Sequence, residues 1–363
     1  MTENAAIRDL DCTVLMFTYE RPYHLARAIS YWEKSGVKVI IADGSKYPCD
    51  NIPESIEYMH RPGASIMQRI FELSNRVKTK FAVFVADDDF LGYEGLEIAV
   101  TFLNKNPDYA SAQGLYTQYR ITKPFNKIVT RPAGTCFANH YNWSSDDYVT
   151  RLRDINSYKI MHYCYSVVTK EVLDTLYSLF QGIEVVKGDT LFEPLMAYSI
   201  AINGKIKTLQ SFYCARESVE SPDWLGIMSF EKFVEENSAE YRRLIDNVAA
   251  ECTKKYGTEH HEAIAAAEMA GITYHDSMRK RMETANTKNN DFNVFNIINE
   301  MINKVIVPIK LLLQNIGLTS TRGIDSKFFS ENVDALIAYK HDWEKIKLCI
   351  YKSEETKGDS KGG

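Results

Sequence analysis

The sequence has 363 residues, of which 45% are hydrophobic and 25% are charged, so it can build a globular core of ordinary size. Its formal net charge of −5 excludes a global attraction to nucleic acid, and an anionic substrate has to be held locally by a metal ion or a few basic side chains. The seven cysteines form no CxxC pair, and no apolar stretch is long enough to span a bilayer. These features predict a cytoplasmic protein with reduced thiols.

Strand-like and helix-like segments alternate through the first third of the chain. Short apolar runs predict buried strands at residues 13–17, 37–42, 56–60, 81–86 and 110–115. Apolar residues at helical spacing predict helices between these runs, at residues 22–35, 64–77 and 95–104. This alternation predicts an α/β fold with a Rossmann-like, mostly parallel sheet and helices on its faces.

The rest of the chain is mixed at first and then helical. Strands are predicted at 163–169 and 206–213, and helices at 170–180, 191–203, 230–256 and 263–283. Residues 290–318 form an amphipathic stretch with three interpretations. It could belong to a core, form a homodimer interface, or lie on a membrane surface with Lys304 and Lys310 beside its apolar face.

Polar clusters follow three of the predicted strands. These clusters are Thr18-Tyr19-Glu20-Arg21, Asp43-Gly44-Ser45 and Asp87-Asp88-Asp89. Because ligands of such sheets bind at the carboxyl ends of the strands, we expect the three clusters to meet there. Three adjacent carboxylates repel each other, and a hard cation such as Mn²⁺ or Mg²⁺ compensates that repulsion. The alternative is a solvated acidic turn that caps the next helix.

The order and spacing of these motifs resemble the nucleotide-sugar-binding half of the glycosyltransferase A (GT-A) fold, particularly family 2. The resemblance covers roughly residues 11–115, with a polar turn at 17–22, the Asp43-Gly44-Ser45 signature, Gly63 before a helix that carries Arg69, and a DxD motif at 87–89. Gln68-Arg69-Ile70 stands where Ala-Arg-Asn is usual, which is a departure from the family pattern.

The resemblance implies roles for individual residues. Thr18 and Tyr19 are expected to line the nucleobase pocket, and Asp43 to accept a hydrogen bond from the base. Asp87 is expected to contact ribose or sugar hydroxyls, and Asp89, with Asp87 as second candidate, to ligate the metal. The remaining expected donor-binding residues are Glu20, Arg21, Gly44, Arg69 and Asp88.

An inverting transferase also needs a general base that takes the proton of the acceptor hydroxyl. In the resembled family this base is an acidic residue before a helix in the second half of the domain. Asp189 is the first candidate and Glu193 the second, four residues further on the same helical face. The alternative for Asp189 is a helix N-cap. His162 and Tyr163 are candidates to face the acceptor, and Arg216 to close over the diphosphate.

The sequence therefore predicts a metal-dependent inverting glycosyltransferase that uses a nucleoside-diphosphate sugar, a UDP-sugar by preference. The acceptor is expected to be a hydroxyl of a glycan or of a lipid-linked molecule. The predicted units are a catalytic domain at 1–229 (donor half 11–115, acceptor half 116–229), a helical region at 230–350 and a disordered tail at 351–363.

Two functions other than glycosyl transfer are alternatives for this sequence. A catalytically degenerate scaffold would act through its C-terminal helices, whereas a nucleotidyltransferase is disfavoured because no Gly-rich basic loop follows the first strand. Peripheral contact with the inner face of a membrane, or a homodimer, would involve the same helices.

Overall fold

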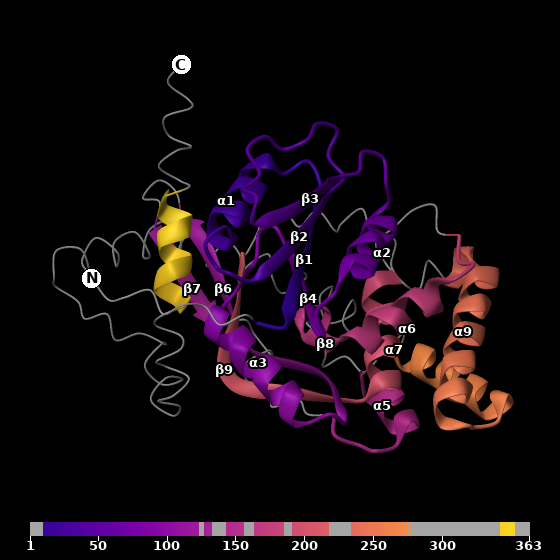
Figure 1. The fold of residues 1–363 in the computed structure, drawn as a ribbon. Coiled ribbons are helices and arrows are strands. Elements are labelled where there is room, and N and C mark those ends of the chain that lie inside the picture. Colours follow the sequence, from indigo (N-terminus) through magenta and orange to yellow (C-terminus); the bar gives the residue numbers. More distant parts are fainter. Residues whose placement is uncertain are drawn as a thin grey trace, which may run out of the picture.

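The computed structural model describes residues 10–122, 127–132, 143–155, 163–184, 191–217, 234–274, 276 and 342–352. These residues form a single mixed sheet that is covered by helices on both faces (Figure 1). The strand order is β3-β2-β1-β4-β8-β6-β9-β5, with β7 paired to β6 outside this path. The predicted α/β class with a mostly parallel sheet is confirmed.

The first four strands of the chain run parallel to one another. They are β1 (Cys12–Thr18), β2 (Lys38–Asp43), β3 (Ile56–His60) and β4 (Phe81–Ala86). Neighbouring residues along them belong to opposite core layers, as Leu15 and Met16 do, because both faces of the sheet are covered. The predicted strands at these positions are confirmed to within one residue.

The second half of the sheet brings further strand ends to the same edge. Its strands are β5 (Phe90–Leu91), β6 (Tyr109–Thr122), β7 (Lys127–Pro132), β8 (Val167–Thr169) and β9 (Lys205–Glu217). The short β8 is antiparallel to both β4 and β6, and β9 is parallel to β6. Strands β4, β6 and β9 therefore run in one direction, and their carboxyl ends face the same rim.

The helices cover the sheet in two layers. One face carries α1 (Pro22–Trp32), α3 (Tyr93–Lys105) and a helix at 342–352, which is drawn in yellow in Figure 1. The other face carries α2 (Ile66–Arg76), α5 (Tyr148–Ile155), α6 (Lys170–Phe180), α7 (Phe192–Asn203) and α9 (Ser238–Tyr256). The C-terminal helix thus returns to the N-terminal half of the chain. None of the helices in the described ranges is long and apolar enough to cross a membrane.

Some predicted boundaries are wrong. Residues 163–165 form a 3-10 turn, closed by the Ser166 amide donating to the Tyr163 carbonyl at 2.9 Å, and the strand begins only at Val167. Strand β9 continues past residue 213 to Glu217. Residues 351–352 are helical and continuous with the helix described from residue 342, although the tail was predicted to be disordered from 351. The stretch at 290–318 lies outside the described residues.

We expect Gly95→Ala to destabilise the fold. A Cβ atom at Gly95, on α3, would lie 2.4 Å from the carbonyl oxygen of Phe212 on β9. The backbone of β9 is paired with β6 and β5 and cannot move aside easily. Such overpacking costs about 1–3 kcal/mol, measurable by urea unfolding. Thr101→Ala on the exposed side of α3 is the control and should cost nothing. Equal stability of the Gly95→Ala variant and the wild type would contradict this packing.

Candidate active site

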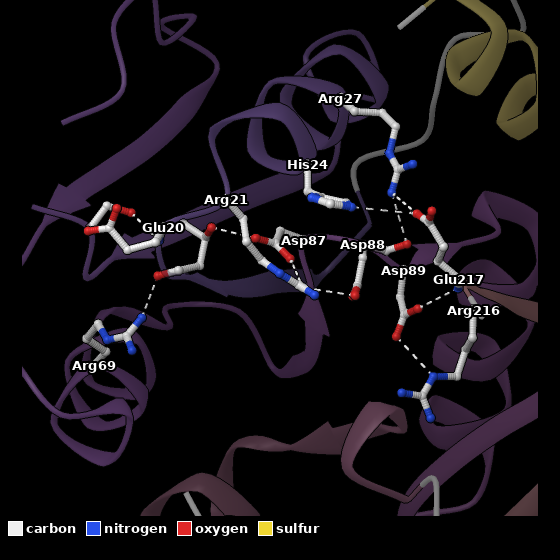
Figure 2. A network of polar contacts seen from close by, with 12 residues as sticks. Glu20, Arg21, His24, Arg27, Arg69, Asp87, Asp88, Asp89, Arg216 and Glu217 are labelled. Atoms are coloured by element: carbon white, nitrogen blue, oxygen red, sulfur yellow. Dashed lines mark hydrogen bonds and ion pairs between the residues drawn. The ribbon is translucent and has the colours of Figure 1, made fainter. Parts of the chain in front are cut away.

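The turns after β1 and β4 are joined by direct hydrogen bonds at the rim. Thr18 Oγ1 donates to Asp87 Oδ2 at 2.5 Å, and Arg21 Nη1 donates to Asp87 Oδ1 at 2.9 Å (Figure 2). The same Arg21 nitrogen donates to Asp88 Oδ2 at 2.9 Å. Arg21 therefore bridges two of the three aspartates, and the predicted meeting of the first and third polar clusters is confirmed.

Asp89 faces the end of β9 instead. Its Oδ2 accepts from Arg216 Nε at 3.0 Å, and its Oδ1 accepts from the backbone amide of Glu217 at 3.1 Å (Figure 2). The Arg216 guanidinium also lies over the ring of Tyr165, at 5.0 Å from the ring centroid. Three consecutive carboxylates are thus divided between two sides of the rim, which reduces their mutual repulsion.

Burial makes two of these carboxylates hard to ionise. The side chains of Asp87 and Asp89 are each only 2% exposed, whereas that of Asp88 is 14% exposed. Desolvation raises the pKa of Asp87 to about 6, although the hydrogen bond from Thr18 and the charge of Arg21 both lower it. Desolvation likewise raises the pKa of Asp89 to about 6, although the charge of Arg216 lowers it. The neighbouring arginines therefore compensate the lost hydration only in part.

A second polar group, not predicted from the sequence, supports the aspartate turn from behind. The Glu217 Oε2 atom accepts from Arg27 Nη2 at 2.6 Å and from the Tyr119 hydroxyl at 3.1 Å. The same two donors reach the backbone carbonyl of Asp88, at 3.2 Å and 3.0 Å. His24 Nε2 lies 3.9 Å from Glu217 Oε2, and burial is the largest of the effects that lower the pKa of His24. Arg27 and Tyr119 thus fix both the turn and the Glu217 carboxylate.

The rim carries more acidic than basic groups. Asp87, Asp88, Asp89 and Glu217 outnumber the arginines that pair with them, which are Arg21, Arg27 and Arg216. An incoming diphosphate would meet this excess of negative charge. Within the described part of the chain, no three His, Cys, Asp or Glu side chains form a ready cage for a metal ion. A cation here would have one or two carboxylates and depend on oxygens of the substrate, as Mg²⁺ often does.

Beside the aspartates, the turns after β1 and β2 form the surface predicted to bind a base. The ring of Tyr19 is 60% exposed and lies 6.0 Å from the Arg69 guanidinium. Arg69 Nη1 donates to the Thr18 carbonyl at 2.6 Å. Asp43 is buried, and its two oxygens accept from the Ser45 amide at 2.8 Å and the Tyr58 hydroxyl at 2.7 Å. Asp43 therefore stabilises the turn that carries Gly44. The aromatic ring that this surface exposes to solvent is that of Tyr19.

Glu20 ties these two turns together in a strained conformation. Its φ is 53°, in the left-handed region that residues other than glycine rarely adopt. Its amide donates to Ser45 Oγ at 2.7 Å, and its Oε1 accepts from the Lys46 amide at 2.8 Å. Strain of this kind persists where surrounding contacts impose it, and it is frequent at ligand sites.

On the acceptor side, two of the predicted residues, Asp189 and His162, lie outside the described residues. Tyr163 is buried, and its hydroxyl donates to the carbonyl of Glu193 at 2.9 Å, so it supports the start of α7. The Glu193 side chain is exposed in the first turn of that helix. Burial chiefly, and then the Glu193 charge, raise the pKa of Cys164, while Arg216 lowers it.

The raised pKa of Asp89 predicts a pH-dependent stability. Because the folded pKa of about 6 lies above the ordinary aspartate value of 3.8, the protonated group favours folding at low pH, and this contribution is lost as pH rises through about 6. Relative to Asp89→Asn, the wild type should lose up to about 3 kcal/mol of unfolding free energy between about pH 4 and about pH 8. Urea unfolding across this range measures it. A difference that does not change with pH would contradict the buried, ionisable Asp89.

Gly44→Ala should displace Arg69. A Cβ atom at Gly44 would lie 2.8 Å from Arg69 Cζ, and the guanidinium is held by its bond to Thr18. We expect a loss of about 1–3 kcal/mol in unfolding free energy. In an Arg69→Ala background, where the space is open, the same substitution should cost far less. Equal costs in both backgrounds would show that Arg69 does not fill this space.

Comparisons with known proteins give similarity of fold only. No family model matches the sequence, and no curated protein matches it. A crystal structure of residues 1–349 of S. aureus TarS matches at 10% identity and a TM-score of 0.45, covering 77% of this chain and 74% of that one. The same fragment in complex with UDP-GlcNAc matches at 15% identity and 0.45, covering 69% of each chain. Another S. aureus TarS structure matches at 12% and 0.42, covering 69% of this chain and 41% of that chain.

Proposed function

We propose that this protein is an inverting glycosyltransferase. It transfers a sugar from a nucleoside-diphosphate sugar, by preference a UDP-sugar, to a hydroxyl of a glycan or lipid-linked acceptor. The observation that carries the proposal is that hydrogen bonds join the ends of β1, β4 and β9. Thr18 and Arg21 donate to Asp87, and Arg216 donates to Asp89. A sheet rim of this kind is where open α/β folds bind nucleotides.

The proposal includes a divalent cation, and the residues at the rim are suited to bind one. They offer hard carboxylate oxygens, an excess of acidic groups, and two buried aspartates whose pKa values are raised to about 6 because their compensation is incomplete. Asp89, with Asp87 as second candidate, would hold Mn²⁺ or Mg²⁺. When bound, the cation would offset the negative charge of the leaving nucleoside diphosphate.

The chain's own residues supply the remaining donor contacts. The exposed ring of Tyr19 offers a stacking surface for the base, and the Arg69 guanidinium lies 6.0 Å from the ring centroid. Arg21 and Arg216 keep 26% and 31% of their side chains exposed at the rim, so each can hydrogen-bond a phosphate oxygen while it holds an aspartate.

Proton transfer is assigned to the acceptor side. As the acceptor oxygen bonds to the anomeric carbon, the bond from that carbon to the diphosphate breaks, and the hydroxyl proton passes to a carboxylate. Asp189 is the proposed base, and Glu193, exposed at the start of α7, is the second candidate. Contact with the inner face of a membrane or with a second copy would involve residues 290–318, and this also remains a proposal.

Calorimetry with UDP, with and without Mn²⁺, tests the donor site. We expect the wild type to bind UDP in the presence of Mn²⁺, and EDTA to weaken this binding at least ~10-fold, since the cation offsets the excess of acidic groups. Asp89→Ala should weaken it by a similar factor or more. Asp108→Ala is the matched control, because Asp108 is an exposed aspartate paired with Lys205 at the start of β9, away from the rim.

Two results would count against the proposal. Binding of no nucleoside diphosphate, with or without metal, would favour the scaffold alternative. Full UDP binding by Asp89→Ala in the presence of EDTA would remove the role given to the metal. Release of UDP from a UDP-sugar panel by the wild type, lost in Asp189→Ala, would support the assigned base.

A further inference from the structure

The C-terminal helix at 342–352 packs on the layer directly behind the aspartate turn. Its inward residues Trp343, Ile346, Cys349 and Ile350 are all less than 10% exposed and belong to the same core cluster as Phe90 and Tyr119. The rings of Trp343 and Tyr119 have centroids 6.2 Å apart. The Cys349 thiol donates to the Arg27 carbonyl at 3.4 Å, and this helix passes beside Arg27 in Figure 2. The helix therefore contacts both residues that hold the aspartate turn.

The start of the same helix also fixes the segment that follows the turn. Asp342 is fully buried, and its Oδ2 accepts from the Glu94 amide at 3.0 Å, in the first turn of α3. The N-cap residue of α3 is Gly92, which has no side chain for this purpose. Asp342 thus caps α3 from a distant part of the chain, and α3 begins four residues after Asp89.

The link from this helix to the site is short. Tyr119 and Arg27 each donate to the Asp88 carbonyl and to Glu217 Oε2, while the amide of Glu217 donates to Asp89. The Phe90 ring lies between these two donors, 5.1 Å from the Arg27 guanidinium and 6.1 Å from the Tyr119 ring. Movement of Tyr119 would remove one of the two donors that hold the Asp88 carbonyl, and so would loosen the peptide between Asp87 and Asp89.

We propose that the helix at 342–352 is a positioning element of the donor site. It fixes Tyr119 and Arg27, and through them the turn that carries the three aspartates. The helix touches no substrate in this account, and Trp343 is its principal positioning residue. The inference rests on the proposed function where it concerns donor binding, but the order of the turn can be measured without any ligand.

The test compares full-length variants at a temperature where all are folded. Trp343→Ala removes the contact with Tyr119, and Trp343→Phe keeps an aromatic ring there. Leu348→Ala is the control on the same helix, since Leu348 is 57% exposed. Leu176→Ala is the stability control, because it creates a cavity in the opposite core layer, on α6.

Two measurements are made on each variant, the Kd for UDP with Mn²⁺ and the hydrogen exchange of amides 87–92 and 217 without ligand. Trp343→Ala should raise the Kd about 10-fold and speed exchange at these amides by about as much. Trp343→Phe should restore most of the UDP affinity and most of the protection of these amides. In Leu348→Ala and Leu176→Ala, the Kd and the exchange rates should stay within about twofold of the wild type, whatever the melting temperature of the variant.

The outcomes separate this inference from the proposed function. If the wild type binds no UDP, the function fails, and the exchange data alone decide the positioning role. Unchanged exchange in Trp343→Ala would overturn that role. So would equal losses in Leu176→Ala, since they would reflect general destabilisation.

Discussion

Repulsion among three adjacent carboxylates, at Asp87, Asp88 and Asp89, is the constraint on which the rim depends. The fold meets it by sending neighbouring side chains in different directions, Asp87 to the end of β1 and Asp89 to the end of β9. This division is available only because β1 is hydrogen-bonded to β4, while β9 runs in the same direction further along the sheet. The excess negative charge that remains favours a cation, and under the proposed function that cation would offset the charge of the diphosphate.

The first half of the sheet and the rim where its polar turns meet could be predicted from the sequence because their signals are local. An apolar run such as 81–86 fixes a buried strand, and the polar residues that follow it must then lie at a sheet edge. Parallel pairing of β1 with β2 and β4 converts three local signals into one site. The capping box of Ser65 and Gln68 likewise sets the start of α2 within two residues of the prediction.

The support behind the turn could not be predicted, because it depends on long-range contacts. Arg27 lies on a helix face that otherwise carries core residues, and Tyr119 lies in a strand much longer than its apolar run. Glu217 is the last residue of β9, a strand predicted to end at residue 213. Nothing local connects these positions with one another or with Trp343. Asp43 shows the converse, since its motif is recognisable from the sequence but its hydrogen bonds to Ser45 and Tyr58 are visible only in the fold.

A crystal structure with UDP and Mn²⁺ tests the central claim most directly. The account predicts an anomalous Mn²⁺ peak roughly 2.0–2.3 Å from a carboxylate oxygen of Asp89 or Asp87 and from a diphosphate oxygen, with the uracil against Tyr19. A nucleotide bound away from this rim, or a Mn²⁺ ion with no contact to the aspartate turn, would contradict it.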